Sequence, residues 1–207
     1  MATILRTWSY QHPWLYQFIS SLAALAVGGE RRFHQLPLQG VAINADTTVL
    51  DLCCGGGQAT RFLVEQSQHI TGLDASPIAL QQAAQIAPQA SYIEGLAEEM
   101  PLPDSSFDFV HTSVALHEMA VLQRRQILQE VYRVLKPGGC FALIDLHKPT
   151  NPLFWPSLAA FLWLFETETA WQLLSVDLVN ELSSVGFRDC QQRLYAGGSL
   201  QVIQAIK

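Results

Sequence analysis

The chain has 207 residues, of which 12 are Lys or Arg and 18 are Asp or Glu, so its formal net charge is −6. This length predicts one domain, and an acidic chain with a pI near 5.4 lacks the positive field that non-specific nucleic-acid binding needs, so we expect no nucleic-acid partner. Apolar residues make up 49% and charged residues only 14%, against roughly 25% charged in an average domain, which excludes disorder and favours an apolar substrate, a partner or a membrane surface.

No segment has the composition of a transmembrane helix or of a signal peptide. The longest apolar run, 153–165, contains Pro156 and would cover about 20 Å as a helix, where a bilayer core takes about 30 Å. The four cysteines include the adjacent pair Cys53 and Cys54 but no CxxC, so we expect free thiols and no metal site. The sequence therefore predicts a cytoplasmic protein, with contact to a membrane surface left open.

Strand and helix signals alternate along the chain. Short β-branched runs predict strands at 49–52, 70–73, 92–93, 107–111 and 140–146. Helical spacing, with Ser76 and Pro77 typical of an N-cap and a first helical residue, predicts helices at 60–65, 78–86 and 123–135. Such alternation indicates βαβ units in a parallel sheet covered on both faces.

The two ends of the chain differ from this core, which spans 41–149. Residues 8–40 predict an N-terminal helical segment, and residues 150–172, with three tryptophans, predict an aromatic-rich cap. Residues 173–207 predict a closing helix at 177–185 and two strands at 187–194 and 199–206. The whole is one α/β domain, 1–207, with a Rossmann-like, doubly wound, seven-stranded, mostly parallel sheet, a C-terminal antiparallel strand and helical caps.

A glycine loop is the strongest local signal. The strand in VLDLCCGGGQAT (49–60) runs directly into glycines and then into a helix, so a ligand can approach bare backbone amides at a helix N-terminus. Asp74 ends the next strand, where a carboxylate can accept hydrogen bonds from a ribose diol. The dinucleotide fingerprint GxGxxG, started at Gly55, requires glycine where Thr60 stands, which disfavours a nicotinamide cofactor.

Four motifs in order carry a family resemblance. The loop and the segments GLDAS (72–76), EEMPLPDSSFD (98–108) and EVYRVLKPGG (130–139) resemble the class I S-adenosylmethionine (SAM) dependent methyltransferases. GGERRF (28–33) and VALHEM (114–119) are similar to the UbiE-type C-methyltransferases of quinone biosynthesis, from which the region after 150 departs. The resemblance implies SAM as cofactor and a small, apolar aromatic or quinone-like molecule as acceptor.

The resemblance also implies roles for single residues. Gly55 and Gly57 would pack against the amino acid moiety of SAM, with Asp51 beneath it. The ribose hydroxyls would be held by Asp74, and the adenine would meet the backbone amide of Ala97. The full expected cofactor set is Asp51, Cys53, Gly55, Gly57, Asp74, Ala75, Leu96, Ala97, Glu98, Thr112 and Ser113, the last two at the methionine end.

Two positions depart from the family pattern. Cys53 stands where the usual GxGxG has its first glycine. Leu96 replaces an Asp that in many relatives bonds the adenine amino group, and loss of such an acceptor weakens binding by on the order of 1 kcal/mol unless Glu98 substitutes.

Methyl transfer is an in-line displacement that depends mainly on alignment, but a carbon or phenol acceptor must still lose a proton. His117, after the fourth strand, is the candidate base, and its alternative is a helix-start histidine bonded to backbone. Asp145, at the end of the fifth strand, is the candidate substrate-orienting acid or else a surface carboxylate. His111, inside a strand, is expected to be structural.

Several alternatives stay open. The cap is either a helix packed on the sheet with its tryptophans in the core, or an apolar lid over a prenylated or aromatic acceptor. The activity is C-methylation or N- or O-methylation of another small metabolite, although 111–114 (HTSV) lacks the Asn-Pro-Pro-Tyr type signature of amino-group methylation. A non-catalytic SAM-binding partner subunit is the rival outside enzymes, and a homodimer is open.

Overall fold

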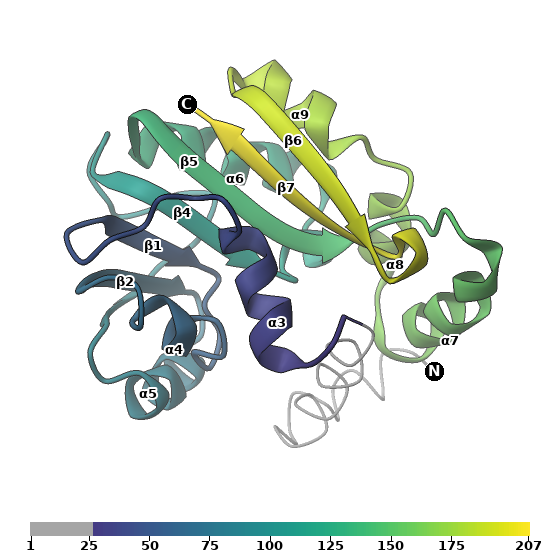
Figure 1. Ribbon diagram of the computed structural model, residues 1–207, viewed down its shortest axis with the longest axis horizontal. Helices are drawn as coiled ribbons and strands as arrows, with labels where there is room; N and C mark the ends of the chain where they lie inside the picture. Colours follow the sequence, from purple (N-terminus) through teal and green to yellow (C-terminus); the bar gives the residue numbers. More distant parts are fainter. Residues whose placement is uncertain (1–26) are drawn as a thin grey trace.

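The computed structural model describes residues 27–207, and its centre is a single seven-stranded sheet (Figure 1). The strands lie in the order β3-β2-β1-β4-β5-β7-β6, and all neighbours run parallel except β7, which is antiparallel to both β5 and β6. Their bounds are β1 (Thr48–Leu52), β2 (His69–Asp74), β3 (Ser91–Glu94), β4 (Phe107–Ser113), β5 (Leu135–Leu146), β6 (Arg188–Tyr195) and β7 (Leu200–Ile206). The predicted Rossmann-like α/β fold with its antiparallel C-terminal strand is confirmed.

Seven α-helices surround the sheet within the described residues. They are α3 (Glu30–Gln35), α4 (Thr60–Leu63), α5 (Pro77–Ile86), α6 (Val121–Val134), α7 (Trp155–Phe165), α8 (Glu168–Leu173) and α9 (Leu178–Val185). The predicted cap of α5 is confirmed, because the Ser76 hydroxyl accepts a hydrogen bond from the backbone N–H of Ala79 at 3.3 Å and Pro77 opens the helix. Of the predicted N-terminal segment, residues 8–26 lie outside the described part of the chain.

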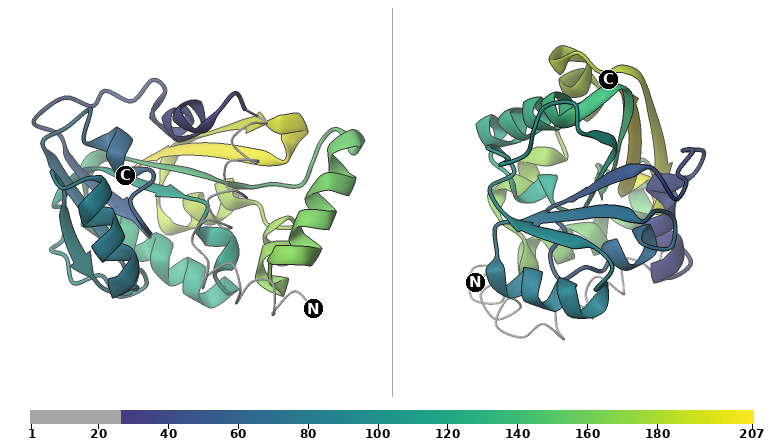
Figure 2. Two further views of the ribbon diagram at one scale, coloured as in Figure 1. Left: turned by 90° about the horizontal axis from the view of Figure 1, so that it is seen from below. Right: turned by 90° about the vertical axis from the view of Figure 1, so that its left-hand side faces the viewer.

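Alternate residues of the central strands enter cores on opposite faces of the sheet. Leu50 joins a cluster with α6, α8 and α9, whereas Val49 packs with Leu63 of α4. Figure 2 shows α3 and α6 on opposite sides of the sheet. Because both faces are covered, β1 and β4 are buried along most of their length, and they hold polar side chains such as Asp51 and His111 as well as apolar ones.

The predicted helix at 123–135 and strand at 140–146 leave 136–139 as a connection between them, and the structure corrects this. Helix α6 already ends at Val134, and β5 begins at Leu135 and includes the Pro-Gly-Gly segment. Leu135 pairs with Phe107 and Cys140 pairs with Phe109, so the register shifts at this point. The segment is therefore an irregularity inside a long strand, a place where proline and glycine are tolerated in sheets.

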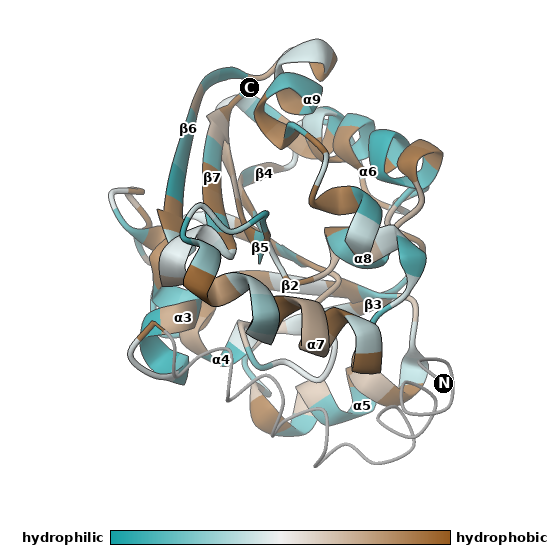
Figure 3. Cartoon of the chain, turned by 90° about the vertical axis from the view of Figure 1, so that its right-hand side faces the viewer, coloured by the Kyte–Doolittle hydropathy of each residue, from teal (hydrophilic) through white to brown (hydrophobic). Residues whose placement is uncertain are grey.

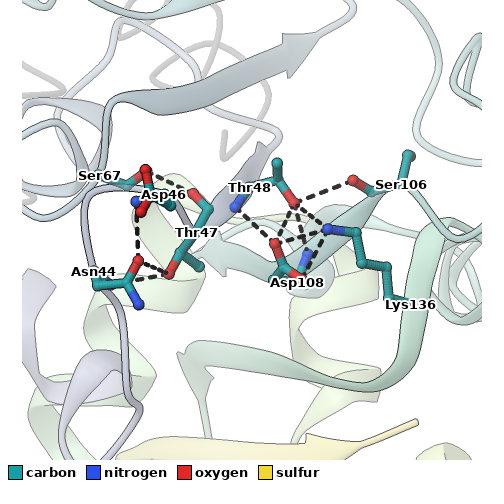
Figure 4. A network of polar contacts seen from close by, with 8 residues as sticks. All are labelled: Asn44, Asp46, Thr47, Thr48, Ser67, Ser106, Asp108 and Lys136. Atoms are coloured by element: carbon teal, nitrogen blue, oxygen red, sulfur yellow. Dashed lines mark hydrogen bonds and ion pairs between the residues drawn. The ribbon is translucent and has the colours of Figure 1, made fainter.

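The amino ends of β1, β4 and β5 are joined by a polar network (Figure 4). Asp108 accepts hydrogen bonds from the Thr48 hydroxyl at 2.6 Å and from Lys136 Nζ at 2.8 Å. Partial burial raises the pKa of Asp108, but the bonds from Lys136 and Thr48 outweigh it and lower that pKa to about 2. This network stabilises the edge of the sheet opposite to the expected site.

The cap consists of α7 and α8, and Figure 3 looks onto it with α7 in front. It buries aliphatic side chains, among them Leu158, Leu162 and Leu173. Its tryptophans are not core residues, since Trp163 is 59% exposed and Trp155 and Trp171 are also exposed. The interpretation that places them in the core is therefore wrong. Among residues 27–207, no helix combines the length and apolar character that crossing a membrane requires.

Candidate active site

The strand order brings the expected site residues to one edge of the sheet. The carboxyl ends of β2, β1, β4 and β5 lie side by side, and they lead into Asp74, the glycine loop, Ser113 and Asp145. In doubly wound sheets ligands bind in the crevice outside this edge. Residues from four separate parts of the sequence thus face one region.

The glycine loop presents its backbone outward. Gly55 has a φ of +52°, and a Cβ added there would meet no atom within 4 Å, so the loop exposes bare backbone to open space. Cys53 has a φ of 55°, in the left-handed region that favours glycine, the residue that the usual GxGxG pattern has at this position. Gly57 fits a closer contact, because its Cβ would lie 2.9 Å from the Ala83 Cα of α5.

Gly57→Ala is expected to destabilise the protein by about 1–3 kcal/mol through this clash, beyond the strain of a left-handed alanine. Gly40→Ala is the matched control, since Gly40 has a similar φ of +82° and open space around its Cβ position. The measurement is urea unfolding of both variants. Equal losses of stability would show that the contact with α5 does not require glycine.

Asp74 is placed to hold a diol. Its two carboxylate oxygens accept hydrogen bonds from the backbone N–H groups of Gly55 and Ser76, each at 2.9 Å. A carboxylate offers about four lone-pair sites, so about two remain for ribose hydroxyls. Ala75, next along the chain, is exposed at the same edge. This arrangement fits a nucleoside beside the loop.

Asp51 lies buried beneath the loop, and protein groups bind both of its oxygens. The Thr60 hydroxyl donates to Oδ2 at 2.6 Å, and His111 Nδ1 lies 2.9 Å from Oδ1. Asp51 and His111 are register partners on β1 and β4. Asp51 therefore ties the loop and the start of α4 to the sheet. The His111 contact follows from strand pairing and the Thr60 contact from the path of the loop into α4, and the sequence alone displays neither.

The remaining cofactor candidates flank the loop. Leu96 is 51% exposed and Ala97 is buried, while Glu98 accepts a hydrogen bond from Gln123 of α6 at 3.0 Å. On β4, the buried Thr112 hydroxyl has no hydrogen-bond partner within residues 27–207, and Ser113 is half-buried. An unpaired buried hydroxyl at this edge fits a ligand that supplies the partner.

His117, in the 3₁₀ turn η2 (Leu116–Glu118), and Asp145 form a buried pair. His117 Nδ1 lies 2.7 Å from Asp145 Oδ1, and Asp145 Oδ2 accepts the backbone N–H groups of Leu116 and His117. The other ring nitrogen, Nε2, lies 3.5 Å from Glu166 Oε2. Glu166, which precedes α8, has no signal in the sequence that would place it here.

The two carboxylates control the charge of His117. Burial lowers the pKa of the ring, but Asp145 and Glu166 together outweigh burial and raise that pKa from 6.5 to about 10. The raised pKa favours a ring that keeps a proton on each nitrogen at neutral pH. An imidazolium has no free lone pair, so this geometry favours a charged, hydrogen-bonding His117 over a base.

The cysteines and acidic groups show no metal-binding arrangement within the described part of the chain, where no three His, Cys, Asp or Glu side chains are grouped to hold an ion. All four cysteines are free, and burial raises the pKa of the thiols of both Cys53 and Cys54. The loop thiols are therefore protonated at neutral pH.

Comparison with known proteins concerns the family of this chain. Residues 49–139 match the model of the methyltransferase domain family. A Synechocystis sp. protein named an uncharacterized methyltransferase is 61% identical over 205 residues, 99% of this chain and 97% of its own length. A demethylmenaquinone methyltransferase of Listeria welshimeri is 38% identical over 118 residues, 53% of this chain and 49% of its own length.

A solved structure supports the same fold. The S-adenosylmethionine-dependent methyltransferase of Mesorhizobium loti superposes with a TM-score of 0.65 at 19% identity, over 86% of this chain and 100% of its own. At that identity the likeness concerns the fold alone, whereas the Synechocystis relative matches nearly the whole length. Together with the glycine loop and the acidic end of β2, these similarities show that the chain belongs to the class I SAM-dependent methyltransferases.

Proposed function

We propose that this enzyme methylates a carbon atom of a small, apolar aromatic acceptor of the quinone type. The observation that carries the proposal is the cap, because it combines an uncharged apolar segment with a place beside the catalytic edge. Residues 149–165 contain no charged residue, and α8 packs against η2, the turn that holds His117. The demethylmenaquinone methyltransferase similarity over about half of each chain supports the same acceptor class.

The cofactor would be held by the residues at the carboxyl edge. Asp74 would accept the ribose hydroxyls, the loop through Cys53, Gly55 and Gly57 would meet the amino acid moiety, and Asp51 would support that loop from beneath. Leu96, Ala97 and Glu98 would border the adenine, and Thr112 and Ser113 the methionine end. When bound, SAM supplies an electrophilic methyl group.

The acceptor would lie between this edge and the cap. Phe161 and Phe165 of α7 have ring centroids 5.8 Å apart, and Trp155 and Trp171 meet edge to face at 6.4 Å. Aromatic surfaces of this kind suit flat rings and prenyl tails. The three exposed tryptophans also support a peripheral contact with a membrane surface, where a prenylated acceptor dissolves. The protein itself would be cytoplasmic.

In the proposed reaction SAM, held by the residues named above, would supply its methyl group to a ring carbon of the acceptor and would retain the electron pair of its carbon–sulfur bond. The ring proton then leaves to water. His117 and Asp145 would serve as orienting charges at this edge, because the two side chains are buried 2.7 Å apart and the raised pKa of His117 favours its charged form. Most of the acceleration would come from alignment of the methyl group with the ring carbon.

The test is methyl transfer from labelled SAM to a prenylated demethylnaphthoquinol. We expect label in the organic phase after extraction, and none when Asp74→Ala replaces the wild type. A catechol and a small primary amine, supplied at the same concentration, serve as control acceptors. Label found only in water-soluble products would overturn the quinone proposal and favour N- or O-methylation of another metabolite.

A further inference from the structure

Glu166 brings a carboxylate from the cap to the edge of the sheet. It follows α7 directly, is 12% exposed, and lies 3.5 Å from Nε2 of His117, whose Nδ1 lies 2.7 Å from Asp145. Asp145 belongs to β5, so the imidazole of His117 contacts a carboxylate of the central sheet on one side and a carboxylate of the cap on the other. The packing of α8 on η2 brings the two parts together at the same place.

The groups around the ring make this junction a charged one. Asp145 faces the ring from β5 and Glu166 faces it from the segment before α8, while Glu118 of η2 and Glu168 of α8 are the other acidic residues of these elements. With both nitrogens turned to carboxylates, only a ring with two N–H donors satisfies both contacts.

We propose that Glu166 is a positioning residue of the methyl-transfer site, which holds the cap closed on the carboxyl edge by binding the charged imidazole that Asp145 binds from the other side. The proposal rests on the proposed function in one respect, since the acceptor is what the closed cap would cover. The three side chains form an Asp145–His117–Glu166 triad that orders η2, the cap and the end of β5 together.

Loss of the Glu166 charge should have two separate effects. The imidazole loses one of its two carboxylate partners, so its proton is released at lower pH. The cap loses its charged contact with η2 and retains its aliphatic packing through Leu158 and Leu162, so it should open more often while the sheet stays folded.

The first experiment follows the His117 ring by nitrogen NMR in protein labelled at histidine, with His117→Asn used to assign its signals. In the wild type we expect a doubly protonated ring between pH 6 and 8.5. In Glu166→Gln the pKa should fall by about one unit or more, whereas Glu168→Gln, a substitution two residues away on the exposed side, should leave it unchanged. A neutral ring at pH 7 in the wild type overturns the proposal, and this result needs no variant.

The second experiment measures backbone hydrogen exchange of residues 155–173. Glu166→Gln should speed exchange there by about tenfold, with Glu166→Asp intermediate and Glu168→Gln unchanged. Equal exchange in Glu166→Gln and Glu168→Gln overturns the proposal.

Neither readout uses an acceptor, so the two proposals can fail separately. With a quinol acceptor, Glu166→Gln should raise KM more than it lowers kcat. If the enzyme does not methylate quinols while the ring titration and the exchange results hold, the proposed function fails and the triad stands.

Discussion

Asp74→Ala is expected to weaken the binding of S-adenosylhomocysteine about 100-fold or more. Hydrogen bonds to a charged group contribute about 1.5–3 kcal/mol each, and the loss of two ribose contacts corresponds to at least two factors of ten. The substitution also removes the acceptor for the N–H groups of Gly55 and Ser76, which loosens the loop itself. The measurement is calorimetric titration of the purified protein, with NAD as a ligand that neither form should bind.

Glu94→Gln is the matched control for this variant. Glu94 is the register partner of Asp74 on the neighbouring strand β3, and its side chain is exposed. Its binding isotherm should equal that of the wild type. Undiminished affinity in Asp74→Ala would mean that the ribose lies elsewhere and would remove the proposed role of this carboxylate.

Asp145→Asn is expected to lower the free energy of unfolding at pH 7 by about 3–5 kcal/mol, although the side chain keeps its shape. The reason is that a buried imidazolium loses its closest countercharge, the situation in which breaking a buried pair costs most. Asp145 is 1% exposed and also accepts two backbone N–H groups of η2, so the turn should loosen as well. Urea unfolding measures the effect, and Asp189→Asn on the exposed strand β6 serves as control.

The raised pKa of His117 determines how the free energy of unfolding changes with pH. The pKa of His117 is about 10 in the folded protein and about 6.5 in the unfolded chain, so the folded state binds the proton more tightly. The stability contributed by the charged ring is complete below pH 6.5 and is lost as the pH rises toward 10. The wild type should therefore lose stability over this range, and Asp145→Asn should lose less. Parallel curves for the two proteins would contradict the charged pair.

The sheet and the cofactor edge could be predicted from the sequence because their signals are local. The parallel strands contain short runs of apolar and β-branched residues, and Ser76 with Pro77 marks the start of a helix by backbone geometry alone. Parallel strands end at the same edge of the sheet, so the fold class alone predicts that the loop after β1 lies beside Asp74 at the end of β2. The identity of the cofactor came from the resemblance of four motifs to the methyltransferase family, because the loop and Asp74 alone also suit a dinucleotide.

Other features escaped prediction because they depend on partners distant in sequence. The irregular start of β5 depends on how Leu135 and Cys140 pair with β4, and the exposure of Trp163 depends on which side of α7 meets the sheet. Sequence patterns do not determine strand register at a bulge, and an apolar helix without alternating polarity does not reveal its buried side.

The sequence by itself thus determined the fold class, the glycine loop, the position of Asp74 and the membership of the methyltransferases. The tertiary structure decided the polar contacts: which side chains bind the two carboxylate oxygens of Asp51, and which charges determine the protonation of His117. The physical reason is that strand signals and turn residues act within a few positions, whereas the protonation of a buried ring depends on every charge that folding brings near it. For His117 those charges are Asp145 of the sheet and Glu166 of the cap.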